Sequence, residues 1–298
     1  MTSPPLHRSA PRAGRQGEET HPSSVPLRVG DLADLYRRVI PATVQVRDSE
    51  GAGSGVVLDQ RGLVATCRHV VEKRGPVVVR QLGAAELPAR VVRSWRPTDL
   101  AILQLPEGTY EALELASEGE LQIGQEVVAV GHPRGLANTL SRGVISGLGR
   151  MMQGARFLQS DAATHPGSSG GPLVDARCRV VGLSSQCRGS PLLSLSIPVD
   201  VVAAGLAEVQ ARFDELAESP YCELCGELGR PGETWCRACG TTLQPPKPLT
   251  VGPIEPDPLG AARIDRCAVC AEEVGEGTLY CTRCGASLLA PPSSGEPG

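Results

Sequence analysis

The sequence has no long hydrophobic run and no surplus of positive charge. Its most extended apolar stretch, near Val201 to Ala207, is far shorter than the about 20 residues that a membrane-spanning helix needs. The formal net charge is −4, so the chain has no basic field to attract nucleic acid and no polybasic segment for a membrane surface. We therefore expect neither nucleic acid nor a membrane span among its interactions.

The N-terminal segment also lacks the apolar centre of a secretory signal, although it contains arginines. Its Pro, Ser, Arg and Gly content is typical of a disordered segment, which we expect over residues 1–28. Without a recognisable export signal, the sequence favours a cytoplasmic location. Aromatic residues are scarce, but hydrophobic residues make up 41% of the chain, which is enough for a globular core over most of its length.

Short runs rich in Val, Ile and Leu dominate residues 43–198. Gly, Pro, Asp and Ser separate them, and no long helical pattern lies between them. A dozen short strands at this spacing predict an all-β barrel or sandwich. A short helix is expected over residues 30–41 and one amphipathic helix over residues 199–219. The sequence thus predicts one domain over residues 29–219.

Four small residues surround one hydroxyl in the stretch GSSGG, residues 167–171, which Pro172 follows. A cluster of this kind usually marks a flexible turn. It is also the composition of a nucleophile loop, because glycines let backbone N–H groups gather around an oxyanion. On its own, the stretch does not decide between these interpretations.

Two upstream segments supply the partners that a nucleophilic Ser169 would need. His69 directly follows the apolar segment LVATC, and Asp99 begins the segment DLAILQL. Taken singly, the histidine could be a packed or solvent-facing residue and the aspartate a turn residue. The order His, Asp, Ser is one of the known arrangements of a Ser-His-Asp hydrolase. We therefore predict that His69, Asp99 and Ser169 form a catalytic triad.

Residues 29–218 resemble the protease domain of the HtrA/Deg family, serine endopeptidases with a trypsin-like double β-barrel. The matching stretches, in family order, are GAGSGVVLD-x-x-GLVATCRHVV, PTDLAILQL, VVAVGHPRGL-x-x-TLSRGVISG, QSDAATHPGSSGGPL, VVGLSS and SIPVD. The resemblance implies His69 as the general base, Asp99 as its orienting carboxylate and Ser169 as the nucleophile. It also implies an oxyanion hole made by the backbone N–H groups of Gly167 and Ser169. Trimers are common among such relatives, which suggests a homo-oligomer.

The trypsin-like pattern also implies where the primary substrate pocket lies. Its floor falls near Ala163 and Thr164, and Leu183, Ser184 and Ser185 contribute to one wall. No carboxylate lies at this floor, so a preference for Lys or Arg before the scissile bond is not expected. A small or medium aliphatic residue is favoured instead.

Eight of the eleven cysteines form four C-x-x-C pairs after residue 221. Both halves have the spacing C-x2-C-x10-C-x2-C, which fits a tetrahedral zinc site of four thiolates. Disulfides are disfavoured by the expected compartment, and chance or redox pairs by the matched spacing. The predicted ligands of two structural zinc ions are Cys222, Cys225, Cys236, Cys239, Cys267, Cys270, Cys281 and Cys284.

This tail resembles the double zinc ribbon family and stands where HtrA relatives commonly have a PDZ domain. We expect ribbons over residues 220–244 and 266–290, a Pro-rich linker over 245–265 and a disordered tail over 291–298. Catalytic zinc is not expected, because Cys fills all four positions of each site. The ribbons would recruit a substrate or partner or mediate self-association; a redox-sensing role is the weaker alternative.

The sequence therefore predicts an HtrA-like serine endopeptidase that hydrolyses peptide bonds of protein substrates through an acyl-enzyme on Ser169. The alternative is a catalytically silent trypsin-like scaffold that acts as a zinc-ribbon adaptor. For Cys67, Cys178 and Cys187, which lie outside the C-x-x-C pairs, we expect reduced, buried thiols.

Overall fold

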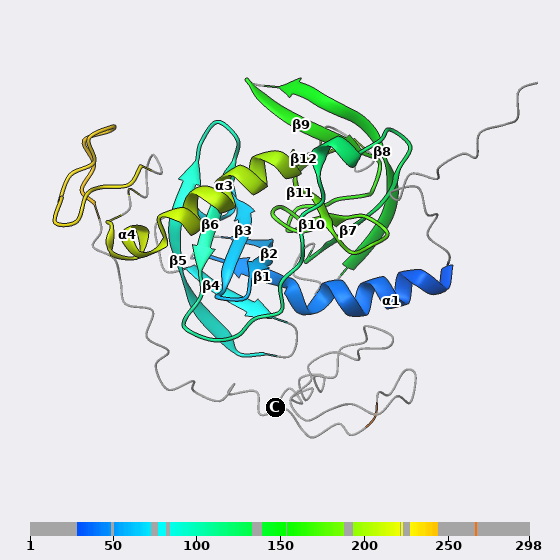
Figure 1. Ribbon diagram of the computed structural model, residues 1–298, viewed down its shortest axis with the longest axis horizontal. Helices are drawn as coiled ribbons and strands as arrows, with labels where there is room; N and C mark the ends of the chain where they lie inside the picture. The colour runs from blue at the N-terminus through cyan, green and yellow to red at the C-terminus, as the bar shows by residue number, and fades with distance from the viewer. Residues whose placement is uncertain are drawn as a thin grey trace, which may run out of the picture.

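The computed structural model describes residues 29–48, 51–72, 77–81, 84–132, 139–152, 154–187, 193–220, 222, 227–243 and 266. The predicted N-terminal segment, Pro-rich linker and C-terminal tail lie outside these residues, and so does the second zinc ribbon apart from Arg266. Within the described ranges, the strands form two closed antiparallel barrels (Figure 1).

The first barrel has the strand order β1-β2-β3-β6-β5-β4. Pairing of β1 with β4, in the register Val44↔Gln81, closes it. A cluster of buried Val, Leu and Ile side chains fills its interior, because nearly every position of β1, β2, β3 and β6 is inaccessible to solvent. Its strands are β1 (Thr43–Arg47), β2 (Ala52–Asp59), β3 (Leu63–Cys67), β4 (Val77–Gln81), β5 (Glu86–Trp95) and β6 (Leu100–Gln104).

The second barrel has the order β10-β11-β12-β9-β8-β7 and is closed by pairing of β10 with β7. The core of the first barrel continues into it through Val128, Val130 and Leu183, so the two barrels share one hydrophobic contact region. The all-β double barrel expected from the sequence is therefore confirmed. The strands are β7 (Glu126–Gly131), β8 (Thr139–Met152), β9 (Ala155–Ser160), β10 (Pro172–Val174), β11 (Val180–Cys187) and β12 (Ser194–Pro198).

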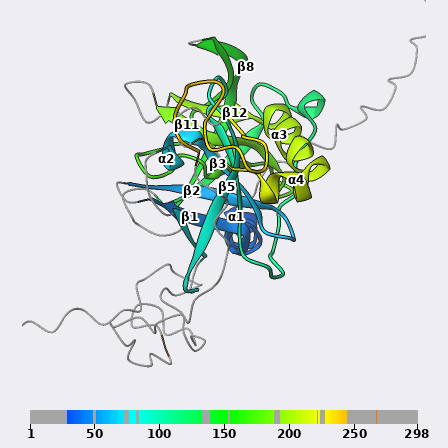
Figure 2. The same ribbon diagram turned by 90° about the vertical axis from the view of Figure 1, so that its left-hand side faces the viewer.

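Helices flank the barrels on different sides (Figures 1 and 2). At the N-terminal side, α1 (Val29–Val39) runs into the 3-10 turn η1 (Ile40–Ala42). At the other end, α3 (Val199–Ala211) packs on β6 and β11, one strand from each barrel. The short elements α2 (Arg68–Val71) and η2 (Glu118–Glu120) lie in loops.

The single closing helix expected over residues 199–219 is instead two helices. Arg212 leaves the helical region, with φ −121° and ψ 24°, and α4 (Phe213–Glu218) begins after it. The change of direction places the Phe213 ring 4.9 Å from the guanidinium carbon of Arg61 and leaves Leu216 buried. No helix in the described part of the chain combines the length and apolarity that crossing a membrane requires.

Beyond α4, residues 227–243 together with Cys222 form a small unit, coloured yellow in Figure 1, whose Leu228 packs against the main hydrophobic core. Its buried centre consists of Cys222, Cys236 and Leu243. A single β-bridge joins Trp235 to Thr242, and few other apolar side chains in the described part of this unit are covered. A unit with so little core requires an additional source of stability.

Candidate active site

His69 and Asp99 are brought together by the pairing of two neighbouring strands. The antiparallel register of β3 and β6 sets Cys67 opposite Leu100, so the residues just after β3 lie beside those just before β6. The backbone N–H of Arg68 donates to the Asp99 carbonyl at 2.6 Å. The side chains meet in the same place, with 2.7 Å between His69 Nδ1 and Asp99 Oδ2.

The Asp99 carboxylate is fixed on three sides. Besides the imidazole, it accepts the backbone N–H of His69 at Oδ1, at 3.1 Å, and the Ser185 hydroxyl at Oδ2, at 2.9 Å. Its own backbone lies in the left-handed region, with φ 58°, where Asp is found more often than most residues. The carboxylate therefore holds the imidazole by its Nδ1 side and leaves the other ring nitrogen available.

This contact moves the pKa of both groups. Burial is the largest effect on His69 and disfavours the imidazolium, but the hydrogen bond and charge of Asp99 and the charge of Glu72 outweigh it and raise the pKa of His69 above 6.5. For Asp99, burial favours the protonated form, yet the bonds and charge from His69 and the Ser185 hydroxyl hold its pKa below 3.8. The contact thus favours the ionised form of Asp99 and the protonated form of His69.

Two consecutive turns form the loop around Ser169. The first is closed by the Ser168 N–H on the His165 carbonyl at 2.9 Å, and Gly167 within it has φ 99°. Pro followed by a glycine with positive φ is the combination that a type II turn favours. The second is closed by the Gly171 N–H on the Ser168 carbonyl at 3.0 Å. Within the described part of the chain, the N–H groups of Gly167 and Ser169 have no hydrogen-bond acceptor.

A hydroxyl group from the first barrel anchors this loop. The Ser54 hydroxyl, on β2, donates to the Gly167 carbonyl at 2.8 Å and accepts the backbone N–H of His132 at 2.9 Å. The backbone N–H of Ser54 donates to the Ser169 carbonyl at 2.7 Å. Ser54 therefore joins β2 of one barrel to the residue that follows β7 and to the Ser169 loop of the other.

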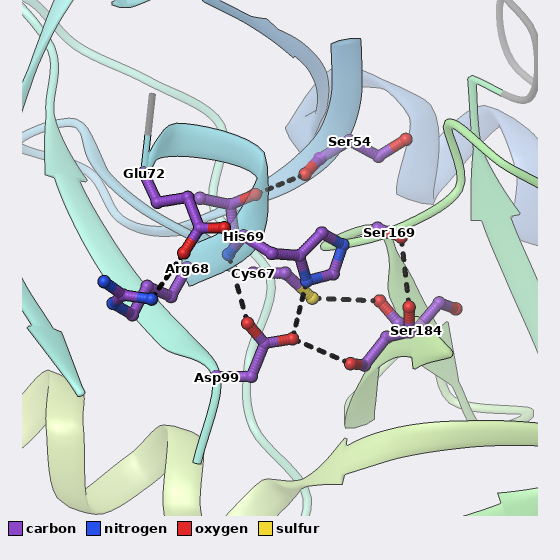
Figure 3. Close-up of polar contacts among 10 residues, drawn as sticks. Ser54, Cys67, Arg68, His69, Glu72, Asp99, Ser169 and Ser184 are labelled. Atoms are coloured by element: carbon purple, nitrogen blue, oxygen red, sulfur yellow. Dashed lines mark hydrogen bonds and ion pairs between the residues drawn. The ribbon is translucent and has the colours of Figure 1, made fainter. Parts of the chain in front are cut away.

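The Ser169 hydroxyl lies near the dyad without bonding to it. It donates to the Ser185 carbonyl at 3.0 Å, and no hydrogen bond joins it to His69 within the described residues. Figure 3 shows the free side of the His69 ring turned toward Ser169. The structure thus brings His69 and Asp99 into contact and connects Ser169 to them through Ser185.

A cavity of about 680 Å³ opens beside the dyad. Of the five residues expected to form the primary pocket, Ser185 alone lines it. The Leu183 side chain is fully buried in the core, and Ser184 is 2% exposed, so neither side chain is available to a substrate. Ala163 and Thr164 do not line this cavity, and the Thr164 hydroxyl bonds to that of Ser194 at 2.8 Å. The cavity is lined by Arg68, His69, Arg96, Pro97, Asp99, Met152, Ala155, Phe157 and Ser185.

Sequence reasoning did not identify the roles of Ser54 and Ser185. Ser54 lies in the GAGSG stretch, where a hydroxyl between two glycines indicates a close backbone approach, and Gly53 does lie against the Ser169 carbonyl. Ser185 was expected to line the pocket, whereas the structure also makes its hydroxyl a partner of Asp99. His132, beside Ser54, is buried and contacts the Ser54 hydroxyl through its backbone N–H at 2.9 Å and through its ring Nδ1 at 3.4 Å.

Three cysteines of the first predicted zinc ribbon lie together. The sulfur atoms of Cys222, Cys236 and Cys239 are all within 4.8 Å of one another, and those of Cys222 and Cys239 are 3.5 Å apart. Cys225 lies outside the described residues, as do the four cysteines of the second ribbon. Cys67 and Cys178 are free thiols and buried, and the side chain of Cys187 is outside the described set.

The fold and these contacts have the arrangement of a trypsin-like serine hydrolase site, and the chain is similar to known proteins of this kind. Residues 53–183 match the family of trypsin-like peptidase domains. The putative serine protease HhoA of Synechocystis is 35% identical over 181 residues, which cover 57% of this chain and 46% of that protein. The solved HtrA-type protease AlgW with a tripeptide is 29% identical, with a TM-score of 0.56 over 59% of this chain and 62% of that one. The two barrels therefore have a trypsin-like fold that is similar to the protease domains of HtrA- and DegP-type proteins.

The relatives also bear on length and location. The chain spans less than half the length of the curated relatives HhoA and the DegP-like protein of Hahella chejuensis, which is 35% identical over 37% of its own length. That protein and a relative from Pseudomonas putida are named probable periplasmic serine endoproteases. The cytoplasmic location expected from the sequence is therefore wrong; the weak N-terminal composition signal on which it rested lies outside the described residues.

Proposed function

We propose that the chain is a serine endopeptidase that hydrolyses peptide bonds of protein substrates through an acyl-enzyme on Ser169. The observation that carries this proposal is the His69–Asp99 contact beside a loop that offers two backbone N–H groups without an acceptor among the described residues. A serine hydroxyl is a poor nucleophile unless a base takes its proton, and an oxyanion needs donors that are already in place. His69 could act as the base, and the N–H groups of Gly167 and Ser169 could act as the donors to the oxyanion.

In the proposed mechanism, the Ser169 hydroxyl turns from the Ser185 carbonyl to the free nitrogen of His69. Catalytic hydrogen bonds are often long or misaligned without substrate, so this turn accompanies substrate binding. His69 takes the proton as Ser169 attacks the carbonyl carbon, and returns it to the leaving amine. Asp99 stabilises the imidazolium, and the N–H groups of Gly167 and Ser169 stabilise the oxyanion. Water then hydrolyses the acyl-enzyme by the same base.

A fluorophosphonate probe tests this proposal, because it phosphonylates only an activated serine. We expect labelling of the full-length chain at Ser169, loss of labelling in Ser169→Ala, and cleavage of a protein substrate that is lost in the same variant. Ser168→Ala is the matched control, since it removes the neighbouring hydroxyl. Labelling that vanishes with Ser168 and persists in Ser169→Ala would overturn the assignment. No labelling with or without added peptides would favour the catalytically silent adaptor instead.

For substrate preference, we propose that a small or medium aliphatic side chain precedes the scissile bond. Ala163 and Thr164, at the expected floor of the primary pocket, offer no carboxylate to pair with Lys or Arg. A peptide library with one varied position before the cleavage site measures the preference. Faster cleavage after Lys or Arg than after Val or Ala would contradict it.

We further propose that the eight C-terminal cysteines hold two structural zinc ions. The residues of the first site fit the metal, because two thiolates on one tetrahedral zinc are about 3.8 Å apart, against about 2.05 Å in a disulfide. The 3.5 Å between the Cys222 and Cys239 sulfur atoms is close to the former value. Zinc binding would also supply the stability that the small core around Leu243 does not.

Zinc content is measured directly by elemental analysis of the full-length protein. We expect two zinc ions per chain, one in Cys236→Ser, and two in the control Cys178→Ser, which removes a buried thiol of the protease domain. Equal zinc content in all three proteins would contradict the proposal.

We propose that the ribbons recruit substrate or a partner, or join copies of the chain in a homo-oligomer. Comparing cleavage of a short peptide with that of a folded protein tests recruitment. A loss in Cys236→Ser confined to the folded protein supports it, and an equal loss on both counts against it. Sedimentation of the parent protein and of Cys236→Ser measures self-association.

The names of the relatives support a location outside the cytoplasm, which we propose in place of the cytoplasmic one. Fractionation of cells that express the full-length protein measures it. Recovery with periplasmic or secreted markers is expected, and recovery with cytoplasmic enzymes would contradict it.

A further inference from the structure

Cys67 lies directly behind the catalytic dyad. It is the last residue of β3, two positions before His69, and it is completely buried. Its thiol donates a hydrogen bond to the Ser184 carbonyl at 3.3 Å and also lies in contact with Asp99, Ser185 and the Gly170 backbone; a thiol is a weak donor and a weak acceptor in such contacts. Figure 3 shows the sulfur between the His69 ring and Ser184, on the side of the ring that faces Asp99.

Three different metal-ligating atoms converge at this point. The Cys67 sulfur, a ring nitrogen of His69 and a carboxylate oxygen of Asp99 all lie within 4.8 Å of one another. In a tetrahedral zinc site, ligand atoms of these kinds are about 3.3–3.6 Å apart, given the usual zinc–sulfur and zinc–nitrogen bond lengths. Shifts of about 1 Å or less would therefore bring the three atoms into one coordination sphere, and water from the neighbouring cavity could complete it.

The charges at this position favour a bound divalent cation over a free thiolate. A thiolate alone would be buried beside the Asp99 anion and is strongly disfavoured. With a divalent ion, one thiolate and one carboxylate give a neutral complex, so its burial costs little. Arg68 and Arg96 line the same cavity, and their positive charge disfavours a complex that carries a net positive charge.

We propose that Cys67, His69 and Asp99 form an inhibitory site for a thiophilic divalent cation, of which Zn²⁺ and Cd²⁺ are the probes. The proposal rests on the proposed protease activity, because its effect is to disable that site. On binding, the Cys67 thiol loses its proton to solvent, and the imidazole proton passes from Nδ1 to the other ring nitrogen. That nitrogen then donates a hydrogen bond instead of accepting one, so His69 is no longer the base for Ser169. Asp99 is withdrawn from its orienting role at the same time.

The first test is inhibition of the full-length protein by added Zn²⁺ or Cd²⁺, each activity being normalised to the same variant without added metal. We expect inhibition that is reversed by a chelator equimolar with the added ion. In Cys67→Ser and Cys67→Ala, the half-inhibiting concentration should rise at least about 10-fold, since even indirect ligand-shell changes weaken metal sites by 10–100-fold. The control Cys178→Ser should respond as the parent protein does. Equal inhibition of all four proteins would overturn the proposal.

A second measurement does not depend on activity. Cadmium–thiolate bonds absorb in the ultraviolet, so titration of Cd²⁺ into zinc-loaded Ser169→Ala should give an absorbance step that is missing in Ser169→Ala/Cys67→Ala. If no protein cleaves a peptide without added metal, the proposed protease function fails, while a Cys67-dependent step still supports the metal site. Identical titration curves for the two proteins would overturn the site, whatever the activity.

Discussion

The Ser54 hydroxyl offers a direct test of how the Ser169 loop is held. In Ser54→Ala, the Gly167 carbonyl and the His132 N–H both lose a partner, at 2.8 and 2.9 Å respectively. A buried group left without its hydrogen bond costs about 1–3 kcal/mol, and Gly167 is only half-buried, so the free energy of unfolding should fall by about 2–4 kcal/mol. The two backbone bonds of Ser54 to Ser169 and Thr66 remain, which limits the loss.

Catalysis should respond more specifically than stability. Gly167 carries both the carbonyl that accepts from Ser54 and the N–H proposed for the oxyanion hole. When the carbonyl loses its hydrogen bond, the N–H can move out of position. Complete loss of one such donor costs 10²–10³ in kcat; for a partial displacement we expect a decrease in kcat of about 10–100-fold, which is about 1.4–2.7 kcal/mol. KM should change little, because the ground state does not use the oxyanion hole.

The assay combines urea unfolding with kcat and KM on one peptide substrate. Ser146→Ala is the matched control, since its hydroxyl on β8 makes only a 3.5 Å contact to the Val144 carbonyl. If Ser54→Ala loses stability but keeps its kcat, Ser54 stabilises the fold and does not contribute to catalysis. If neither quantity changes, the hydroxyl does not hold the loop.

Three further outcomes are expected. Because the pKa of His69 is raised above 6.5 and the base must be neutral, kcat/KM should increase with pH with a midpoint above 6.5; Glu72→Gln removes one of the charges that raise it, and should move the midpoint toward lower pH in a pH-rate profile. Gly170→Ala should abolish labelling by the fluorophosphonate and lower the thermal midpoint, since φ is 86° and the added Cβ would lie 2.1 Å from a backbone oxygen. Ser185→Ala removes the hydroxyl bonded to the dyad carboxylate while its backbone carbonyl stays, and should lower kcat about 10-fold in the same peptide assay, the cost of about one hydrogen bond to a charged group. An unchanged midpoint, labelling rate or kcat in the respective experiment would refute that prediction.

Most of the architecture is encoded locally and was therefore accessible from the sequence. Each barrel strand is a short run of β-branched and aliphatic residues between turn residues, which is a signal within one segment. The proximity of His69 and Asp99 follows once β3 pairs with β6, because both residues lie at the adjoining ends of these strands. The break at Arg212 was missed, since the apolar stripe through Leu206, Val209 and Leu216 continues across it.

Contacts between the barrels were not accessible in this way. The partners of Ser54 come from the residue that follows β7 and from the Ser169 loop, more than 75 positions further along the chain, and no local pattern encodes such a meeting. Prediction of the residues that line the substrate pocket was limited for a related reason. Alternation along β11 marks which side chains point inward, but an inward side chain such as Leu183 can face either a pocket or a packed core, and only the neighbouring barrel decides that it is core.

The position of Ser185 links the resting and the catalytic arrangements. Its carbonyl holds the Ser169 hydroxyl away from His69, while its hydroxyl holds the Asp99 carboxylate in line with the imidazole. In the proposed mechanism, a single residue of β11 therefore holds the orienting carboxylate and competes with the base for the nucleophile. Substrate binding along β11 would have to take over the Ser185 carbonyl or shift it slightly to release Ser169. In the proposed mechanism, the serine would then be freed when a peptide binds beside Ser185, where the pairing of β11 with β12 is irregular, so that activation of the nucleophile would depend on the presence of a chain to cleave.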